Sequence, residues 1–225
     1  MANLNTPRGF SPVGALHSSN YSEKGRMYAI PTSDTSNSYA IGDCVMSAAS
    51  SDANGVPYVQ KWGGVATTSA LPLGIIVGVS PVEAGVSLVA ATLDLTQTYI
   101  LAGTRTAVRY VYIADDPNLL YEVSAGTTAT NITLAKMRYN SGIGSWYTAA
   151  DQTYAIDQTT YLAPSSPYSN IILSSATVNT TNTLPVQMLG LSQKPDNAIG
   201  AYARILCRFN NHEFGNATGT NFTGL

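Results

Sequence analysis

Histidine chemistry in this chain depends on two residues, because the 225-residue sequence contains no histidines besides His17 and His212. His17 lies in a segment rich in Asn, Pro, Gly and Ser, where no rigid scaffold would hold an imidazole in a catalytic geometry. His212 follows Cys207 by five residues, and an odd separation places two side chains on opposite faces of a continuing strand. A Cys/His catalytic dyad is therefore not expected.

Oxygen ligands cluster at two places in the sequence. Asp115-Asp116 could supply half of an acid–base pair or part of a calcium site, since both need adjacent carboxylates. The following Pro117 favours a simpler interpretation, in which both Asp side chains close a turn after a strand. Residues 210–213, Asn-Asn-His-Glu, could offer mixed metal ligands, but a polar turn explains them as well. We favour turns in both cases and expect no metal and no cofactor.

Motifs that activate a nucleophile or cradle a phosphate are absent from the sequence, as are zinc-finger spacings of Cys and His. Cys44 and Cys207 could form one bridge in principle. Residues 1–20, however, lack a charged segment followed by an apolar one, so we expect no Sec export and two reduced thiols. No catalytic residue is predicted.

Aromatic residues offer one further chemistry, carbohydrate stacking, through Trp62, Trp146 and the 14 tyrosines. Aromatic side chains on strands more often cover a sheet face or a subunit interface, because they bury a large area at low entropy cost. A glycan hydrolase would also need paired carboxylates on a rigid sheet, and only the turn at Asp115 competes for that role. A glycan-active enzyme is therefore a remote alternative.

Composition limits the fold and the partners. Charged residues make up 11% of the chain, with 11 Lys+Arg and 13 Asp+Glu, against roughly 25% in an average soluble domain. Scarce Lys, Glu and Gln disfavour helices, while the 44% of hydrophobic residues can form a real core. The net charge of −2 provides no cationic surface for nucleic acid, and no apolar run is long enough to span a membrane.

Alternating apolar residues predict strands rather than helices along most of the chain. The clearest run is 107–114, where Val111 and Ile113 share one face. A second run, 202–209, places Ile205, Cys207 and Phe209 together on one face. We therefore predict an all-β protein, either a β-barrel or a jelly-roll-like sandwich, with these five side chains in its core.

Three blocks of the sequence carry a resemblance to a known family. They are residues 2–13 (ANLNTPRGFSPV), residues 110–117 (YVYIADDP) with 121–123 (YEV), and residues 205–214, which include Asn-Asn-His at 210–212. Together they resemble a family of tailed-bacteriophage virion proteins, described as structural proteins or as capsid cement or decoration proteins. The blocks span both ends and the middle of the chain, whereas residues 125–185 match the family poorly.

The resemblance implies a non-enzymatic accessory protein that is made in the host cytoplasm and binds the outer surface of the icosahedral head. Its partners would be the major capsid protein and further copies of itself, with a trimer favoured over a dimer. The near-neutral charge fits a place away from packaged DNA. A tail-associated or receptor-binding virion protein is the alternative, although neither a fibrous repeat nor a coiled coil is present.

The sequence divides into an N-terminal arm (1–25), a β domain (26–210) that contains a loop-rich insertion or inserted lobe (125–185), and a C-terminal arm (211–225). Apolar residues in the arms are too sparse for a local core and too apolar for a solvating tail. We therefore expect them to become ordered on assembly, as contacts to capsid or neighbouring subunits. These residues are Leu4, Phe10, Val13, Phe214, Phe222 and Leu225.

Overall fold

The structure is a computed structural model of the chain, and it describes residues 3, 8–17, 25–62, 71–83, 97–126, 132–145 and 169–215. The regular elements in these ranges are strands, apart from one short 3-10 helix, η2 (Leu134–Lys136). The all-β prediction is therefore confirmed. Within the same ranges, no helix has the length and apolar character needed to cross a membrane.

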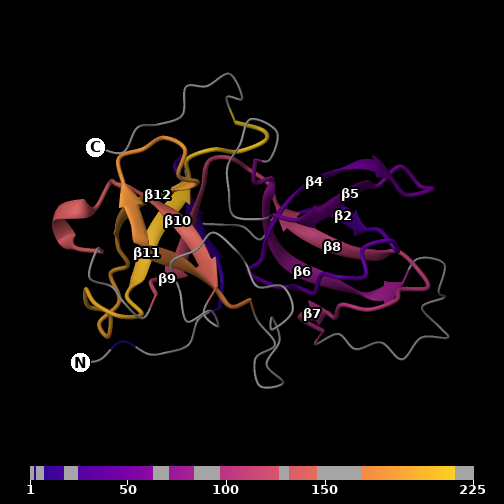
Figure 1. The fold of residues 1–225 in the computed structure, drawn as a ribbon, viewed down its shortest axis with the longest axis horizontal. Coiled ribbons are helices and arrows are strands. Elements are labelled where there is room, and N and C mark those ends of the chain that lie inside the picture. Colours follow the sequence, from indigo (N-terminus) through magenta and orange to yellow (C-terminus); the bar gives the residue numbers. More distant parts are fainter. Residues whose placement is uncertain are drawn as a thin grey trace.

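Five strands close into a barrel in the order β2-β5-β4-β6-β8, seen on the right of Figure 1. Their bounds are β2 (Arg26–Ile30), β4 (Cys44–Ser51), β5 (Pro57–Lys61), β6 (Gly74–Glu83) and β8 (Arg109–Ala114). A two-stranded sheet of β3 (Tyr39–Ala40) and β7 (Tyr99–Ile100) accompanies it. Apolar side chains such as Val45, Val59 and Val111 fill one buried cluster of these strands. The barrel is one of the two architectures that the sequence predicts.

The other six strands form an antiparallel sheet in the order β1-β9-β13-β12-β10-β11, on the left of Figure 1. Their bounds are β1 (Ser11–Ala15), β9 (Leu119–Ser124), β10 (Asn140–Ser145), β11 (Ile171–Asn179), β12 (Val186–Leu191) and β13 (Arg204–Phe209). Strand β9, the second strand of this sheet, therefore lies between β1 and β13, which come from opposite ends of the chain.

The predicted core face is confirmed in both strands that carried it. Exposed fractions are 0% for Val111, Ile113, Ile205 and Cys207 and 5% for Phe209. In β13 the residues between them are half-buried, as a strand with one core face requires. Period-2 alternation therefore identified these buried positions from the sequence alone.

The barrel and the sheet share a hydrophobic core. Cys44, Trp62 and Ile75 come from the barrel strands and their ends, and they belong to the same buried cluster as Tyr121 and Phe209 of the sheet. All are at most 5% exposed. Because apolar burial contributes roughly 25 cal/mol per Å², this shared cluster couples the two parts energetically.

Residues 125–185 differ from the expected inserted lobe. Their described part supplies β10 and β11, and β10 pairs with β12 of the main sheet. The Ala125–Leu173 bridge ties the start of this region to β11 as well. Hydrophobic periodicity is low here because short polar residues such as Ser141 and Ser174 are buried, and the Ser141 hydroxyl donates to the Ser174 carbonyl (2.9 Å).

Candidate functional site

The three blocks that carry the family resemblance meet in one place. Strand β1 of the first block pairs with β9, and β9 pairs with β13 of the third. One aromatic residue from each strand region enters the shared core: Phe10, Tyr121 and Phe209. Their ring centroids are 5.2 to 5.9 Å apart, within the range of favourable aromatic pairs. Residues far apart in sequence thus build a single junction.

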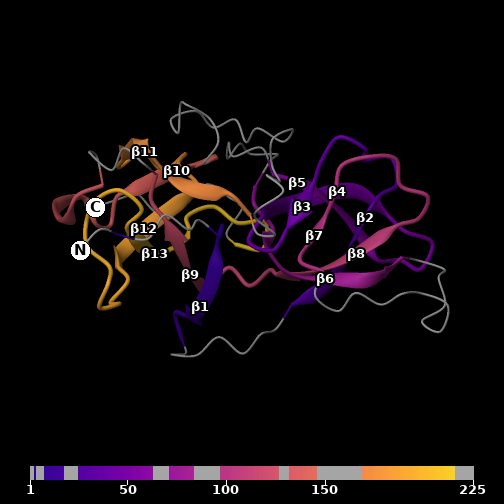
Figure 2. The same cartoon turned by 90° about the horizontal axis from the view of Figure 1, so that it is seen from below.

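A close backbone approach brings Phe10 into this junction. The Phe10 N–H donates to the Gly42 carbonyl (N···O 3.0 Å). Gly9 and Gly42 both have positive φ, and a Cβ on Gly9 would lie 2.4 Å from the Gly42 oxygen. Only glycine avoids that clash and adopts this backbone easily. Figure 2 shows the result, with β1 beside β9 at the border between sheet and barrel.

The described part of the N-terminal arm therefore belongs to the fold, and the expectation that it orders only on assembly is wrong there. Phe10 is 2% exposed, and Asn3 is held by three hydrogen bonds to Ala198 and Ala201. Partners distant in sequence supply the core that residues 1–25 lack on their own. Val13 remains 42% exposed, and Leu4 lies outside the described residues.

The C-terminal block continues past β13 onto the barrel. The Glu213 carboxylate accepts hydrogen bonds from the Ser47 N–H (2.7 Å) and hydroxyl, and its own N–H donates to the Pro72 carbonyl (3.0 Å). His212 is 5% exposed, and its Nδ1 accepts from the Phe214 N–H (3.1 Å). Burial lowers the His212 pKa to about 4. These groups fasten a turn, as expected, and are not arranged as metal ligands.

Phe214 ends this block on the surface, 51% exposed, with the Arg26 guanidinium 5.8 Å from its ring centre. Arg26 also lies 3.5 Å from an Asp115 oxygen that accepts a hydrogen bond from Tyr28 (2.7 Å). Burial, together with this hydrogen bond, raises the pKa of Tyr28. Phe222 and Leu225, the other predicted contacts of the C-terminal arm, lie outside the described residues.

The turn interpretation of Asp116 is confirmed. One Asp116 oxygen accepts from the Asn118 N–H at 2.8 Å, and the Leu119 N–H donates to the Asp116 carbonyl at 3.2 Å. Asp115 is 8% exposed and faces Tyr28 and Arg26 instead. Asp116 thus closes a turn, whereas Asp115 contacts two side chains of β2. Both carboxylates therefore make structural contacts.

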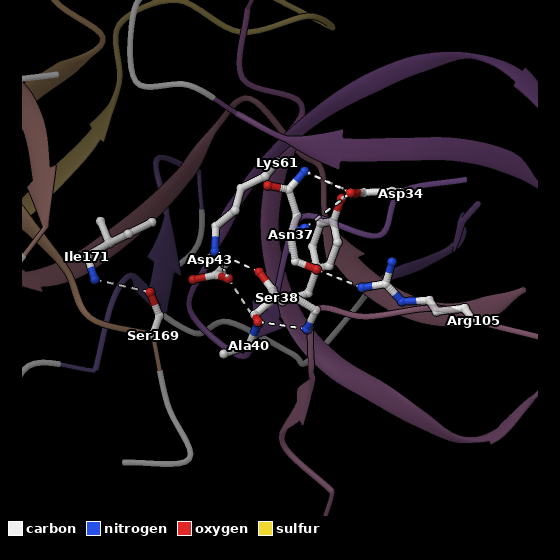
Figure 3. A network of polar contacts seen from close by, with 11 residues as sticks. Asp34, Asn37, Ser38, Ala40, Asp43, Lys61, Arg105, Ser169 and Ile171 are labelled. Carbon is white, nitrogen blue, oxygen red and sulfur yellow. Dashed lines mark hydrogen bonds and ion pairs between the residues drawn. The ribbon is translucent and has the colours of Figure 1, made fainter. Parts of the chain in front are cut away.

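A buried ion pair lies at one end of the barrel, where Lys61 Nζ is 3.0 Å from Asp43 Oδ2 (Figure 3). Both side chains are 0% exposed. Lys61 also donates to the Ser38 carbonyl (2.8 Å), and Asp43 accepts from the Ala40 N–H (2.9 Å). Burial lowers the Lys61 pKa, while Asp43 opposes that shift. The pair fixes the 38–43 turn to β5.

The polar network continues to the outer loops, as Figure 3 shows. Tyr39 donates its hydroxyl proton to Asp34, which also accepts from the Asn37 side chain (3.0 Å). Arg105 donates to the Asn37 carbonyl (2.6 Å) and lies 5.9 Å from the Tyr39 ring centre. The Lys61 side chain is 0% exposed, and its amine contacts Asp43 and the Ser38 carbonyl, so these contacts join the loops to the barrel.

Both cysteines are buried and free in the structure. Burial raises the pKa of the Cys44 and Cys207 thiols, which keeps them protonated and unreactive. Trp62 is 0% exposed and belongs to the core, so it offers no stacking surface; Trp146 lies outside the described residues. Among the described side chains, no group of three or more His, Cys, Asp or Glu could hold a metal ion.

Two hollows flank the N-terminal segment at the junction. The groove is a cavity of about 690 Å³ between β1 and the outer wall of the barrel. Its lining includes Phe10, Pro12, Ile41, Val77, Gly78 and Tyr112. The cationic pocket, about 310 Å³, is lined by Arg8, Lys194, Arg204 and Glu122, among others, and shares Arg8 and Ser11 with the groove.

Glu122 organises the cationic pocket. One of its oxygens lies 2.7 Å from Lys194 Nζ and 3.6 Å from Arg204, and the other accepts from the Ser192 hydroxyl. Burial alone would raise the Glu122 pKa, but the hydrogen bonds from Lys194 and Ser192 outweigh burial and lower it. One carboxylate therefore holds two cations at the rim of the junction.

Comparisons with known proteins give no relative. No protein-family model matches the chain, and neither the curated proteins nor the solved structures contain a significant match.

Proposed function

We propose that this chain is a non-enzymatic virion structural protein of a tailed bacteriophage. Its role would be that of a decoration, or cement, protein that binds the outer surface of the icosahedral head between major capsid subunits and stabilises it. The observation that supports this proposal best is the junction. The three blocks behind the family resemblance are neighbours in space, joined through β1, β9 and β13 and through three aromatic rings.

Further support comes from how the titratable groups are used. Asp115, Glu213, Lys61 and Asp43 are each engaged in contacts that fasten loops or strands. A protein that works by covering a lattice needs rigidity and surface, and such contacts supply the rigidity. Self-association as a trimer, or second as a dimer, belongs to the same proposal, because symmetric copies multiply weak lattice contacts.

Binding to heads tests this function directly. Purified full-length protein is added to heads that lack it, and the bound copies per head are counted by gel densitometry and by imaging. We expect saturable binding and heads that break at a higher temperature, with heads of an unrelated phage as the control. Equal binding to both kinds of head, or none to either, would contradict the proposal. Sedimentation of the free protein gives the number of chains per oligomer.

A further inference from the structure

We propose that the groove, together with the cationic pocket beside it, is the docking site for an extended segment of the major capsid subunit. That segment would carry a large apolar side chain next to a carboxylate. The inference rests on the proposed function, and it names the surface and the chemistry through which binding would occur.

The groove has the size and lining of a binding site for an apolar side chain. Its volume of about 690 Å³ falls within the roughly 300–1,000 Å³ of pockets that hold ligands. Phe10 and Ile76 contribute buried apolar surface, and Val77 and Tyr112 line the barrel wall.

Exposed apolar side chains lie on and next to this barrel wall. Met27 and Tyr112 are directly opposite each other in the β2–β8 pair, so their side chains share one face, and each is 44% exposed. Neighbouring exposed apolar side chains of this kind are typical of interaction sites on soluble proteins.

The charge of the cationic pocket indicates which polar group the docking segment should carry beside its apolar side chain. Among the described residues that line it, Arg8, Lys194 and Arg204 are basic and Glu122 alone is acidic. The whole chain has only 11 basic residues and a net charge of −2, so this local excess of positive charge stands out. A carboxylate is the complementary group, because Arg and Lys bind carboxylates with strong charge-assisted hydrogen bonds.

Side chains, rather than strand addition, would make the contact. Pro12 has no N–H to donate, and the β1–β9 register shifts between Pro12 and Gly14. Proline and bulges are the features that prevent an edge strand from pairing with another chain. Recognition therefore depends on the groove and on the cations of the pocket.

Titration of heads with three variants tests the site. Met27→Ser/Tyr112→Ser removes the apolar rim, and Lys194→Gln removes one cation. Leu134→Ser is the matched control, because Leu134 is 67% exposed on η2, outside the groove and pocket linings. We expect at least tenfold weaker head binding for the double variant and weaker, less salt-sensitive binding for Lys194→Gln. The control should bind like wild type, and all variants should melt within a few degrees of it.

Outcomes separate this inference from the proposed function. Wild-type protein that does not bind heads overturns the function itself, whereas variants that bind like Leu134→Ser overturn only the docking site. A second measurement identifies the partner: Met27→Cys, labelled with a benzophenone, is photolysed on heads. Both native thiols are buried, so the label is specific. Cross-links to the capsid subunit support the inference; cross-links to another copy of this chain, or none above a labelled Leu134→Cys control, overturn it.

Discussion

Phe10→Ala should destabilise the whole protein, although Phe10 lies only a few residues from the start of the described chain. The side chain is 2% exposed and contacts Tyr121 and Phe209, with ring centroids 5.9 and 5.5 Å away. Truncating a buried Phe costs about 3–5 kcal/mol, and each aromatic pair contributes about 0.5–1.5 kcal/mol beyond burial. We expect a loss of about 4 kcal/mol, a large part of the 5–15 kcal/mol typical of folded proteins.

Urea unfolding followed by far-UV circular dichroism measures this loss. With a denaturant slope of about 2–3 kcal/mol per molar, the midpoint should fall by about 1.3–2 M. Val13→Ala is the control in the same N-terminal segment, because Val13 is 42% exposed and its truncation should cost less than about 0.5 kcal/mol. Deletion of residues 1–20 should destabilise at least as much as Phe10→Ala.

The result that refutes this reasoning is equal stability of Phe10→Ala and Val13→Ala. In that case the N-terminal segment would contribute nothing to the folded core, and an arm that orders only on assembly would describe it better. A double-mutant cycle between Phe10 and Phe209 adds a second check, since residues in contact should show a coupling energy of about 0.5 kcal/mol or more.

Three further predictions concern buried titratable groups. Lys61→Met should cost about 3–5 kcal/mol in urea unfolding because it removes the cation beside the buried Asp43, and Lys61→Met/Asp43→Asn should recover more than half of that loss. Burial lowers the His212 pKa to about 4, whereas the unfolded chain titrates near 6.5, so unfolded molecules bind more protons between these values. Stability should therefore fall by about 2–3 kcal/mol from pH 7.5 to 4.5, and His212→Asn should show a flatter dependence. Cys44 and Cys207 should resist a thiol reagent in the native protein and both react after denaturation under non-reducing conditions; fewer than two reactive thiols would contradict the free pair.

Strand interiors could be predicted from the sequence, whereas contacts between distant segments could not. Alternation in 107–114 and 202–209 identified the buried faces, because a side-chain period of two is a local property of a strand. The burial of Phe10 could not be predicted in this way, since the rings that pack against it belong to Tyr121 and Phe209, far along the chain. Sparse apolar residues in a Pro- and Gly-rich segment resemble an arm until those partners are known.

The Lys61–Asp43 pair was missed, yet the sequence contained a signal for it. Counting in steps of two from the buried Val59 places Lys61 on the inward face of β5, next to Trp62. A lysine at an inward position requires a buried partner, because an unpaired charge there would be expensive. The partner itself could not be named from the sequence, since Asp43 comes close to Lys61 only through the antiparallel β4–β5 pairing, in which Val45 lies opposite Lys61.

The position of β9 between β1 and β13 has a consequence for synthesis of the protein on the ribosome. All five barrel strands lie within residues 26–114, so the barrel can close while the rest of the chain is still being translated. Strand β9 then pairs with β1 on one side, but its other neighbour, β13, arrives only with residues 204–209. Pairings of such high contact order form late and slowly. A product that stops before β13 would keep an unpaired, aromatic-bearing edge on β9, and it should aggregate rather than persist as a soluble half.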